Sequence, residues 1–376
     1  MISITVELKD RSYDIDIERR SLDRAGVALA SIGDVSRALV VVDDVVEPLY
    51  CERVASSIMD RGIDLDVVII PAGEQSKSID VGYSLWEHFL DVGADRRSVA
   101  VALGGGVVGD LTGFIAATYQ RGIRFFQIPT TLLAQVDSSV GGKTAIDLPK
   151  GKNMVGAFYQ PRGVLIDPEV LDTLPAEEYQ SGLAEVVKYG AAFDQDFFEM
   201  LEKNVERINA RDPEILGEIV ARCCKIKAAV VEEDEKETSG RRATLNYGHT
   251  FGHSIETALG HGAIPHGYGV AIGSVLAARL AARLAAKGDE RFASIDEPWI
   301  ERQIALIRAL RMPATLSDLG RRYSDSPETA PEALIKLMTN DKKAEDGKLS
   351  FVLPTSLGEC ACVKGVASED VLAILD

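Results

Sequence analysis

Two kinds of hydrophobic pattern divide the chain near residue 180. Before that point, continuous apolar runs at 38–42, 67–70, 98–103, 125–128 and 164–166 alternate with stretches that carry apolar residues at helical spacing. Strands of this kind, separated by helices, are typical of a parallel sheet whose two faces are both covered. The pattern therefore predicts an α/β domain over residues 1–180, with a two-stranded opening at 2–8 and 13–17.

After residue 180, apolar residues recur mainly at helical spacing, and only residues 349–353 predict a late strand. We therefore expect a mostly α-helical second domain over residues 181–376. Its longest apolar segment, residues 267–286, contains Arg279 and Arg283, so it is too polar for a membrane span and predicts a buried helix. A cleft between two such domains is a usual place for a ligand.

Composition and charge narrow the class of partner. The chain has 376 residues, 46% apolar, which is enough for two cores of ordinary size. Its 58 acidic and 41 basic residues give a net charge of −17, which disfavours nonspecific binding to nucleic acid or to an anionic membrane. The five cysteines include no C-x-x-C pair, and the N-terminus lacks the apolar run of a signal peptide. We expect a soluble, cytoplasmic protein.

A glycine-rich segment, Gly104-Gly105-Gly106-Val107-Val108-Gly109, follows a predicted strand and precedes the helix-like residues 110–118. Such glycines let the backbone approach a pyrophosphate, and the helix directs its N–H groups at the charge. A tight turn without a ligand is the alternative. No acidic residue ends a strand about 20 positions later, as in the standard dinucleotide fold. Asp43, Asp44, Glu74 and Lys77 lie in earlier loops, so we expect a dinucleotide bound in a different topology.

Four of the five histidines lie within residues 249–266. His249 and His253 would share one face of a helix, which is the spacing of paired metal ligands, while His261 is in a glycine-flanked loop and His266 follows a proline. Glu185 lies in an apolar segment, where a carboxylate is costly unless it is paired or metal-bound, and pairing with Lys188 is the alternative. Nitrogen and oxygen ligands suit Zn²⁺, with Fe²⁺, Co²⁺ and Mn²⁺ open.

Basic and amide side chains recur beside glycines, against the acidic total: Arg121, Lys143, Lys152, Asn153, Lys188, Lys227, Arg242, Asn246, Lys342 and Lys343. Several such donors together predict an anion pocket that binds a phosphate and a carboxylate. The segment Gly141-Gly142-Lys143-Thr144 is similar to the end of a phosphate loop, but Asp137 stands where that motif requires glycine. ATP binding is therefore not expected.

Taken together, these motifs resemble the 3-dehydroquinate synthase family over nearly the whole chain. The motifs are residues 104–110, 129–144, 151–153, 182–188, 245–253 and 266–267. The resemblance implies a Rossmann-like NAD-binding N-terminal domain and a helical C-terminal domain for metal and substrate. It also implies the reaction of the shikimate pathway that converts 3-deoxy-D-arabino-heptulosonate 7-phosphate (DAHP) to 3-dehydroquinate and phosphate, with NAD regenerated in each turnover.

The resemblance also implies roles for individual residues. Glu185, His249 and His266 become the ligands of Zn²⁺, or of Co²⁺, and His253 moves to the substrate side. Substrate or catalytic contacts are implied for Asp137, Lys143, Asn153, Lys188, Lys227, Arg242, Asn246, His253 and Lys342, with Lys343 as the alternative to Lys342. NAD contacts are implied for Asp43, Glu74, Gln75, Lys77, Gly105, Gly106, Val107, Val108, Gly109, Asp110, Thr130, Thr131, Lys143, Lys152 and Thr173. Arg121 is expected to reach the phosphate pocket of a neighbouring subunit, which implies a homodimer.

Rival functions share some of these features. Cyclases acting on sedoheptulose 7-phosphate, or on glucose 6-phosphate to give 2-deoxy-scyllo-inosose, need no donors for a substrate carboxylate, whereas Arg242, Asn246 and Asp341-Lys342-Lys343 favour one. A metal-dependent alcohol dehydrogenase would release NADH. A noncatalytic NAD sensor would bind cofactor and metal without turnover.

Overall fold

The chain is divided into two units in the computed structural model, which describes residues 1–260, 262–320, 327–340 and 349–375. The first unit comprises Met1–Leu174 and Leu216–Lys236, and the second comprises Pro175–Ile215 and Glu237–Asp376. A single boundary at residue 180 was expected, but most of helix α8 (Pro213–Glu233) returns to the first unit. Contacts explain this return: the Cys224 thiol donates to the carbonyl oxygen of Gln135 at 3.3 Å, and Lys227 pairs with Asp137 at 3.0 Å.

The first unit is built on a seven-stranded sheet in the order β1-β2-β9-β6-β5-β3-β4. All neighbouring strands are parallel except β1 and β2, which are antiparallel. The predicted parallel sheet is therefore confirmed. The strands are β1 (Ile2–Val6), β2 (Tyr13–Ile17), β3 (Arg37–Asp43), β4 (Asp64–Ile70), β5 (Val99–Gly104), β6 (Arg124–Pro129) and β9 (Val164–Ile166).

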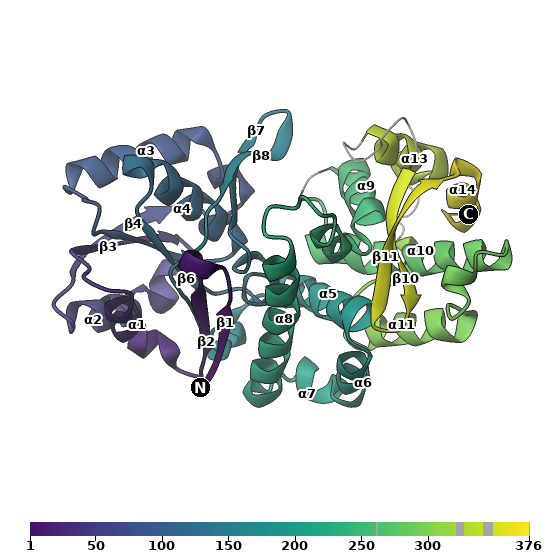
Figure 1. Cartoon of the computed structure of the whole chain (residues 1–376), viewed down its shortest axis with the longest axis horizontal. Helices are drawn as coiled ribbons and strands as arrows, with labels where there is room; N and C mark the ends of the chain where they lie inside the picture. The colour runs from purple at the N-terminus through teal and green to yellow at the C-terminus, as the bar shows by residue number, and fades with distance from the viewer. Residues whose placement is uncertain (261, 321–326, 341–348, 376) are drawn as a thin grey trace. The chain divides into compact units, whose positions relative to one another are not determined.

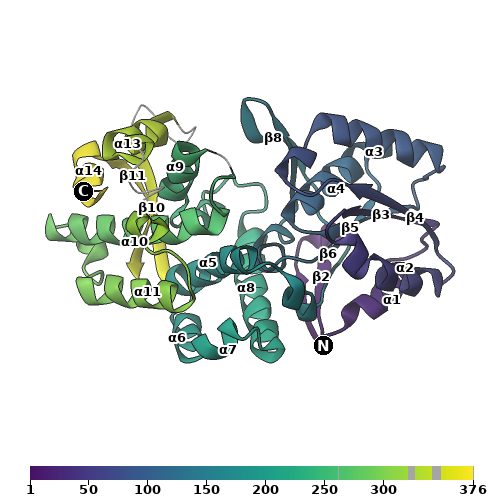
Figure 2. The same cartoon turned by 180° about the vertical axis from the view of Figure 1, so that it is seen from behind.

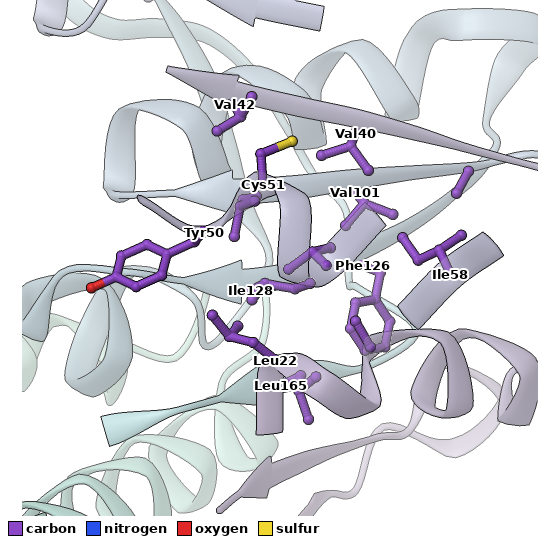
Figure 3. Packing of buried hydrophobic residues seen from close by; sticks show 14 of the residues in the cluster. Leu22, Val40, Val42, Tyr50, Cys51, Ile58, Val101, Phe126, Ile128 and Leu165 are labelled. Carbon is purple, nitrogen blue, oxygen red and sulfur yellow. The ribbon is translucent and has the colours of Figure 1, made fainter. Parts of the chain in front are cut away.

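Helices cover both faces of this sheet (Figures 1 and 2), and successive side chains of each central strand enter opposite cores. Val40 and Val101 pack with Ile58 on one face (Figure 3), whereas Val41 packs on the other face with Phe89. Because neither face of the central strands β3, β5 and β6 meets water, these strands show continuous apolar runs in the sequence. The helices are α1 (Ala25–Ser31), α2 (Glu52–Met59), α3 (Ile79–Asp91) and α4 (Gly106–Thr118).

An antiparallel hairpin in the first unit, β7 (Lys143–Leu148) and β8 (Gly151–Phe158), was not predicted. Most of β8 is exposed, including Met154 and Phe158. Its sequence lacks the regular alternation of a half-buried strand, since glycines interrupt it at 151 and 156.

The second unit is mostly helical, as predicted, and it also contains an antiparallel hairpin (Figure 1). Strand β10 (Leu349–Ser356) confirms the predicted late strand, but its partner β11 (Glu359–Val366) was missed because polar residues and a glycine break its apolar pattern. The helices are α5 (Ala176–Phe193), α6 (Gln195–Lys203), α7 (Val205–Asn209), α9 (His249–Leu259), α10 (His266–Ala286), α11 (Glu297–Ala309), α13 (Pro331–Asn340) and α14 (Ser368–Leu375).

Helix α10 is the buried helix expected over residues 267–286. The argument from polarity was wrong, however, because within the described residues this helix is long and apolar enough to pass for a membrane span. About two thirds of its most apolar window is buried inside the protein, as is usual for the core helix of a folded domain.

Candidate functional site

Three helices of the second unit bring one carboxylate and two imidazoles together. Glu185 comes from α5, and His249 and His266 are the first residues of α9 and α10. The Glu185 Oε1 atom lies 3.4 Å from His249 Nε2 and 3.6 Å from His266 Nε2. One potential ligand atom from each residue lies within 4.8 Å of the other two, so the group can hold a metal ion. A donor set of two nitrogens and one carboxylate suits Zn²⁺ or Co²⁺.

Glycines allow these helices to approach closely enough for the three side chains to meet. A Cβ atom on Gly252 would lie 2.9 Å from the carbonyl carbon of Gly269, and one on Gly273 would overlap the carbonyl oxygen of Gly248. A Cβ atom on Gly267 would likewise overlap the main chain of Ser181 on α5. The backbones of α9 and α10, and those of α10 and α5, are therefore in direct contact at these glycines.

The carboxylate of Glu185 has charged neighbours on both sides. Its side chain is 1% exposed, and the Lys188 ammonium contacts Oε2, while Oε1 faces the two histidines. Burial by itself would raise the pKa of Glu185, but Lys188 and His249 hold that pKa well below its usual range. Both interpretations of Glu185 therefore apply. Its Oε2 atom pairs with Lys188, and its Oε1 atom can bind a metal ion together with the two histidines.

The two histidines differ in their protonation. Burial lowers the pKa of His249 and favours its neutral form, which is the form that binds metals. Burial acts in the same direction on His266, but the carboxylates of Glu185 and Glu256 outweigh it and raise the pKa to about 10. Without a metal, His266 is thus an imidazolium that partly neutralises two carboxylates, and metal binding would displace its Nε2 proton.

His253, the partner of His249 in the pair expected from spacing, does not provide one of the three converging atoms. Its ring is exposed and its centroid lies 5.4 Å from that of His249 and 5.8 Å from that of His266. The structure therefore gathers the ligand set implied by the family resemblance, and not the pair implied by helical spacing. His261, Lys342 and its alternative Lys343 lie outside the described residues.

In the first unit, the glycine-rich segment joins the end of β5 to the first turn of α4. Gly105 is the N-cap of α4, and among the described residues no side chain caps the N–H groups of this turn. A Cβ atom on Gly106 would lie 3.1 Å from the Ser138 hydroxyl, and one on Gly109 would lie 3.0 Å from the Gln127 side chain. Bare backbone at an uncapped helix N-terminus is a cradle for a phosphate group.

Nearby polar groups also fit a bound dinucleotide. The Thr130 side chain is buried, and its hydroxyl has no hydrogen-bond partner among the described residues. The main-chain N–H of Thr130 donates to the carbonyl oxygen of Gly104 at 3.0 Å, which holds the hydroxyl beside the glycine-rich segment. A buried polar group is costly when it is unpaired, so this hydroxyl is available for a ligand. We conclude that these residues fit NAD.

The other residues expected to contact NAD lie at strand ends, in short turns and in the β7–β8 hairpin of the first unit. Asp43 accepts hydrogen bonds from the N–H groups of Val45 and Val46 at 3.0 and 2.8 Å, so its carboxylate stabilises its own turn. Glu74 lies 3.5 Å from Lys152, and the Thr173 hydroxyl lies 2.5 Å from that of Tyr50. Of the remaining members of the set, Gln75 lies in a short 3₁₀ turn, Thr131 follows the end of β6, and Val107 and Val108 lie in the first turn of α4.

Lys77 connects three parts of the first unit. Its buried ammonium lies 2.6 Å from the carboxylate of Asp110 on α4 and contacts the side-chain oxygen of Asn153 on β8. Burial raises the pKa of Asp110, and Lys77 opposes that increase. This lysine therefore fixes the β7–β8 hairpin and the first helix after the glycine-rich segment to each other.

The residues expected to contact substrate are divided between the units. Asp137, Lys143, Asn153 and Lys227 belong to the first unit, and Lys188, Arg242, Asn246 and His253 belong to the second. Lys227 donates to the main-chain oxygen of Asp137 at 2.6 Å, and Arg242 is buried at the start of a short 3₁₀ helix that ends at Asn246. Arg121 is exposed, follows α4 and has a positive φ of 67°.

Sequence reasoning missed one polar residue at the metal group, Glu256 of α9. Its Oε1 atom lies 2.9 Å from His266 Nδ1. The available signal was its position two helical turns after His249, which places both residues on the same face of α9.

The family profile described as 3-dehydroquinate synthase N-terminal matches residues 67–181, and the C-terminal profile matches residues 182–344. A curated 3-dehydroquinate synthase from Desulforamulus reducens is 48% identical over 376 residues, which covers 100% of this chain and 99% of that protein.

Two solved structures with the same fold contain NAD⁺ together with a divalent metal ion. The 2-epi-5-epi-valiolone synthase ValA from Streptomyces hygroscopicus subsp. jinggangensis 5008, with NAD⁺ and Zn²⁺ bound, is 26% identical with a TM-score of 0.84, over 98% of this chain and 97% of that chain. A 2-deoxy-scyllo-inosose synthase complexed with carbaglucose-6-phosphate, NAD⁺ and Co²⁺ is 25% identical with a TM-score of 0.83, over 100% and 99% of the two chains.

Proposed function

Because this chain belongs to the 3-dehydroquinate synthase family, we propose that it converts DAHP to 3-dehydroquinate and phosphate in the shikimate pathway of aromatic amino acid biosynthesis. The reaction comprises oxidation at C5, loss of phosphate, reduction at C5, ring opening and an intramolecular aldol closure, so the enzyme is a carbon–oxygen lyase. One observation carries the proposal. This chain, which is 48% identical to a curated 3-dehydroquinate synthase, brings Glu185, His249 and His266 together in a group that can hold a metal ion.

When bound, NAD⁺ would supply a reversible hydride acceptor, and Zn²⁺ or Co²⁺ would supply a Lewis acid for the oxygen at C5. Residues of this chain would hold both groups in place. The glycine-rich segment and the first turn of α4 would bind the pyrophosphate through main-chain N–H groups. Lys188 would occupy Oε2 of Glu185 and leave Oε1 for the metal.

The substrate carries a carboxylate and a phosphate, and both require charge-assisted donors. We assign this task to Lys143, Asn153 and Lys227 of the first unit and to Lys188, Arg242, Asn246 and His253 of the second. Oxidation at C5 makes the neighbouring C6 proton acidic, so the residues that hold the substrate need to supply only electrostatic stabilisation and a fixed conformation. The sedoheptulose 7-phosphate alternative lacks the carboxylate that the buried guanidinium of Arg242 would bind.

We also propose that the enzyme is a cytoplasmic homodimer, with Arg121 reaching the phosphate pocket of the neighbouring subunit. Arg121 is exposed, and it lies in the turn after α4, where its side chain is accessible to a partner. The five cysteines all lie in described residues and form no disulfide, which suits a reducing compartment.

Phosphate release from DAHP in the presence of NAD⁺ and Zn²⁺, with NADH absorbance followed in parallel, tests the proposed reaction. We expect stoichiometric phosphate without accumulating NADH, and inhibition by a chelator. Release only from sedoheptulose 7-phosphate or glucose 6-phosphate would assign the chain to another cyclase, and net NADH formation from an alcohol would make it a dehydrogenase. Binding of NAD and metal without turnover of any sugar phosphate would indicate that the protein is a noncatalytic NAD sensor.

Substitution of a ligand separates the metal from the cofactor. Glu185→Ala or His249→Ala should lose metal and activity together, whereas NAD affinity should fall much less. His88→Ala, on α3 of the first unit, is the matched control and should retain both. Full activity of metal-depleted His249→Ala protein would contradict the metal assignment.

A further inference from the structure

The ring of His266 lies between two carboxylates that face its opposite nitrogens. Its Nδ1 atom is 2.9 Å from Oε1 of Glu256 on α9, and its Nε2 atom is 3.6 Å from Oε1 of Glu185 on α5. An ionised carboxylate only accepts hydrogen bonds, so Nδ1 must carry the proton that faces Glu256. A neutral ring then has its lone pair at Nε2, on the side where the metal group lies.

His249 has the same arrangement but a different acceptor. Its Nδ1 atom lies 3.2 Å from the carbonyl oxygen of Tyr247, and its Nε2 atom lies 3.4 Å from Oε1 of Glu185. Both rings therefore direct Nε2 to the same carboxylate. The orientation of His249 depends on the main chain, whereas that of His266 depends on a side chain from another helix.

Packing between α9 and α10 holds Glu256 in this position. The Glu256 side chain is 16% exposed, and a Cβ atom on Gly269 would lie 2.9 Å from its Oε1 atom and 3.2 Å from its Cγ atom. Gly269 lies one turn after His266 on α10, so its lack of a side chain opens the path by which the carboxylate reaches Nδ1.

We propose that Glu256 is a positioning residue of the metal site, which holds the His266 ring in the tautomer and orientation that present Nε2 to the metal. Glu256 is not itself a ligand, because its near oxygen is used by Nδ1. Carboxylates behind a ligating histidine commonly act in this way, and their removal lowers metal affinity by about 10–100-fold. The inference rests on the metal site of the proposed function.

Two substitutions separate position from charge. Glu256→Asp keeps the charge but withdraws the carboxylate by one methylene group, whereas Glu256→Gln keeps the reach and an acceptor oxygen but loses the charge. We expect Glu256→Asp to lower the Zn²⁺ affinity of the metal-free protein by about 10–100-fold, and Glu256→Gln to lower it much less. Affinity is measured by competition with a chromophoric chelator, and Glu301→Ala, an exposed carboxylate on α11, is the control.

A spectroscopic measurement decides whether the ring has moved. The chain has only five histidines, so ¹⁵N-histidine spectra of the Zn²⁺-loaded protein can report the state of each ring. We expect His266 to bear the metal on Nε2 and a proton on Nδ1 in the unsubstituted protein and in Glu256→Gln, and to lose this defined state in Glu256→Asp.

Three results would overturn the role of Glu256. The first is a Glu256→Asp protein with unchanged affinity and unchanged Nε2 ligation. The second is a loss of affinity in Glu256→Gln that equals or exceeds the loss in Glu256→Asp, because that result would indicate a charge effect alone. The third is an unsubstituted chain that binds no Zn²⁺, which would remove the metal assignment itself and is distinguishable from the other two.

Discussion

Glycine serves opposite purposes at the two candidate sites. In the first unit, Gly105 and Gly106 leave main-chain N–H groups bare, so that the backbone itself can meet a ligand. In the second unit, Gly252, Gly269 and Gly273 bring helix backbones into contact, and side chains beside the contact meet the ligand. One site is thus made of backbone and the other of side chains that a close helix crossing brings together.

The difference determines how each site should respond to substitution. A methyl group added at Gly106, in the glycine-rich segment, meets the Ser138 side chain and no backbone. A methyl group added at the helix crossing meets backbone, which cannot move without displacing a helix. Substitution of Gly106 should therefore affect mainly ligand affinity, whereas substitutions at the helix crossing should affect stability and metal binding together.

The largest loss of stability is expected from Gly273→Ala. The added methyl group would overlap the carbonyl oxygen of Gly248 and lie 2.8 Å from the amide nitrogen of Gly252. Overpacking of this kind should lower the free energy of unfolding by about 2–3 kcal/mol and weaken Zn²⁺ binding, because α9 carries His249. Denaturant unfolding of the metal-free protein measures the change.

Gly217→Ala is the matched control for that experiment. Gly217 lies in helix α8, and a Cβ atom there would have nothing within 4 Å. Alanine should stabilise this helix by about 0.5–1 kcal/mol through its better helix propensity. If Gly273→Ala and Gly217→Ala changed the free energy of unfolding equally, the close crossing of α9 and α10 would be disproved.

A smaller loss of stability is expected from Lys77→Met, because this substitution leaves the Asp110 carboxylate without its buried cation. The cost should be about 2 kcal/mol near neutral pH, which is less than for a fully buried pair, because Asp110 is 22% exposed. Burial already raises the pKa of Asp110, and loss of Lys77 should raise it further. The folded protein then holds a proton that the unfolded chain releases, so stability should fall as the pH rises above about 4.

Unfolding of Lys77→Met measured at pH 5 and pH 7 tests that sign, and the penalty should be larger at pH 7. Lys336→Met, on an exposed position of α13, is the control. Addition of Asp110→Asn should restore part of the stability, since no buried charge then remains. A penalty that is the same at both pH values, with no recovery in the double variant, would show that the ion pair is not the cause.

The smallest effect on stability is expected from Gly106→Ala. Its methyl group would lie 3.1 Å from the Ser138 hydroxyl, so the free energy of unfolding should change by less than about 0.5 kcal/mol. NAD⁺ affinity, measured by calorimetry, should nevertheless fall by about tenfold or more, because the pyrophosphate can no longer approach the backbone. A stability loss as large as that of Gly273→Ala would abolish the contrast between the two sites.

The sequence predicted best the features that depend on neighbours along the chain. The strand, glycines and helix at 99–118 are contiguous, so the local pattern is sufficient to locate the cradle. The β7–β8 hairpin and strand β11 were missed, because most of β8 is exposed and polar residues interrupt β11. The return of α8 to the first unit was also missed, since it depends on contacts between residues about 90 positions apart, such as that of Cys224 with Gln135.

By itself, therefore, the sequence determined the class of each domain, the phosphate cradle, the crowding of histidines and, through its motifs, the family. Tertiary structure alone decided how the metal group is assembled. Helical spacing favoured His253 as the partner of His249, whereas the fold directs His266 and Glu185 towards it. The physical reason is that the ligands come from three helices, and their convergence depends on backbone contacts at glycines that no local pattern encodes.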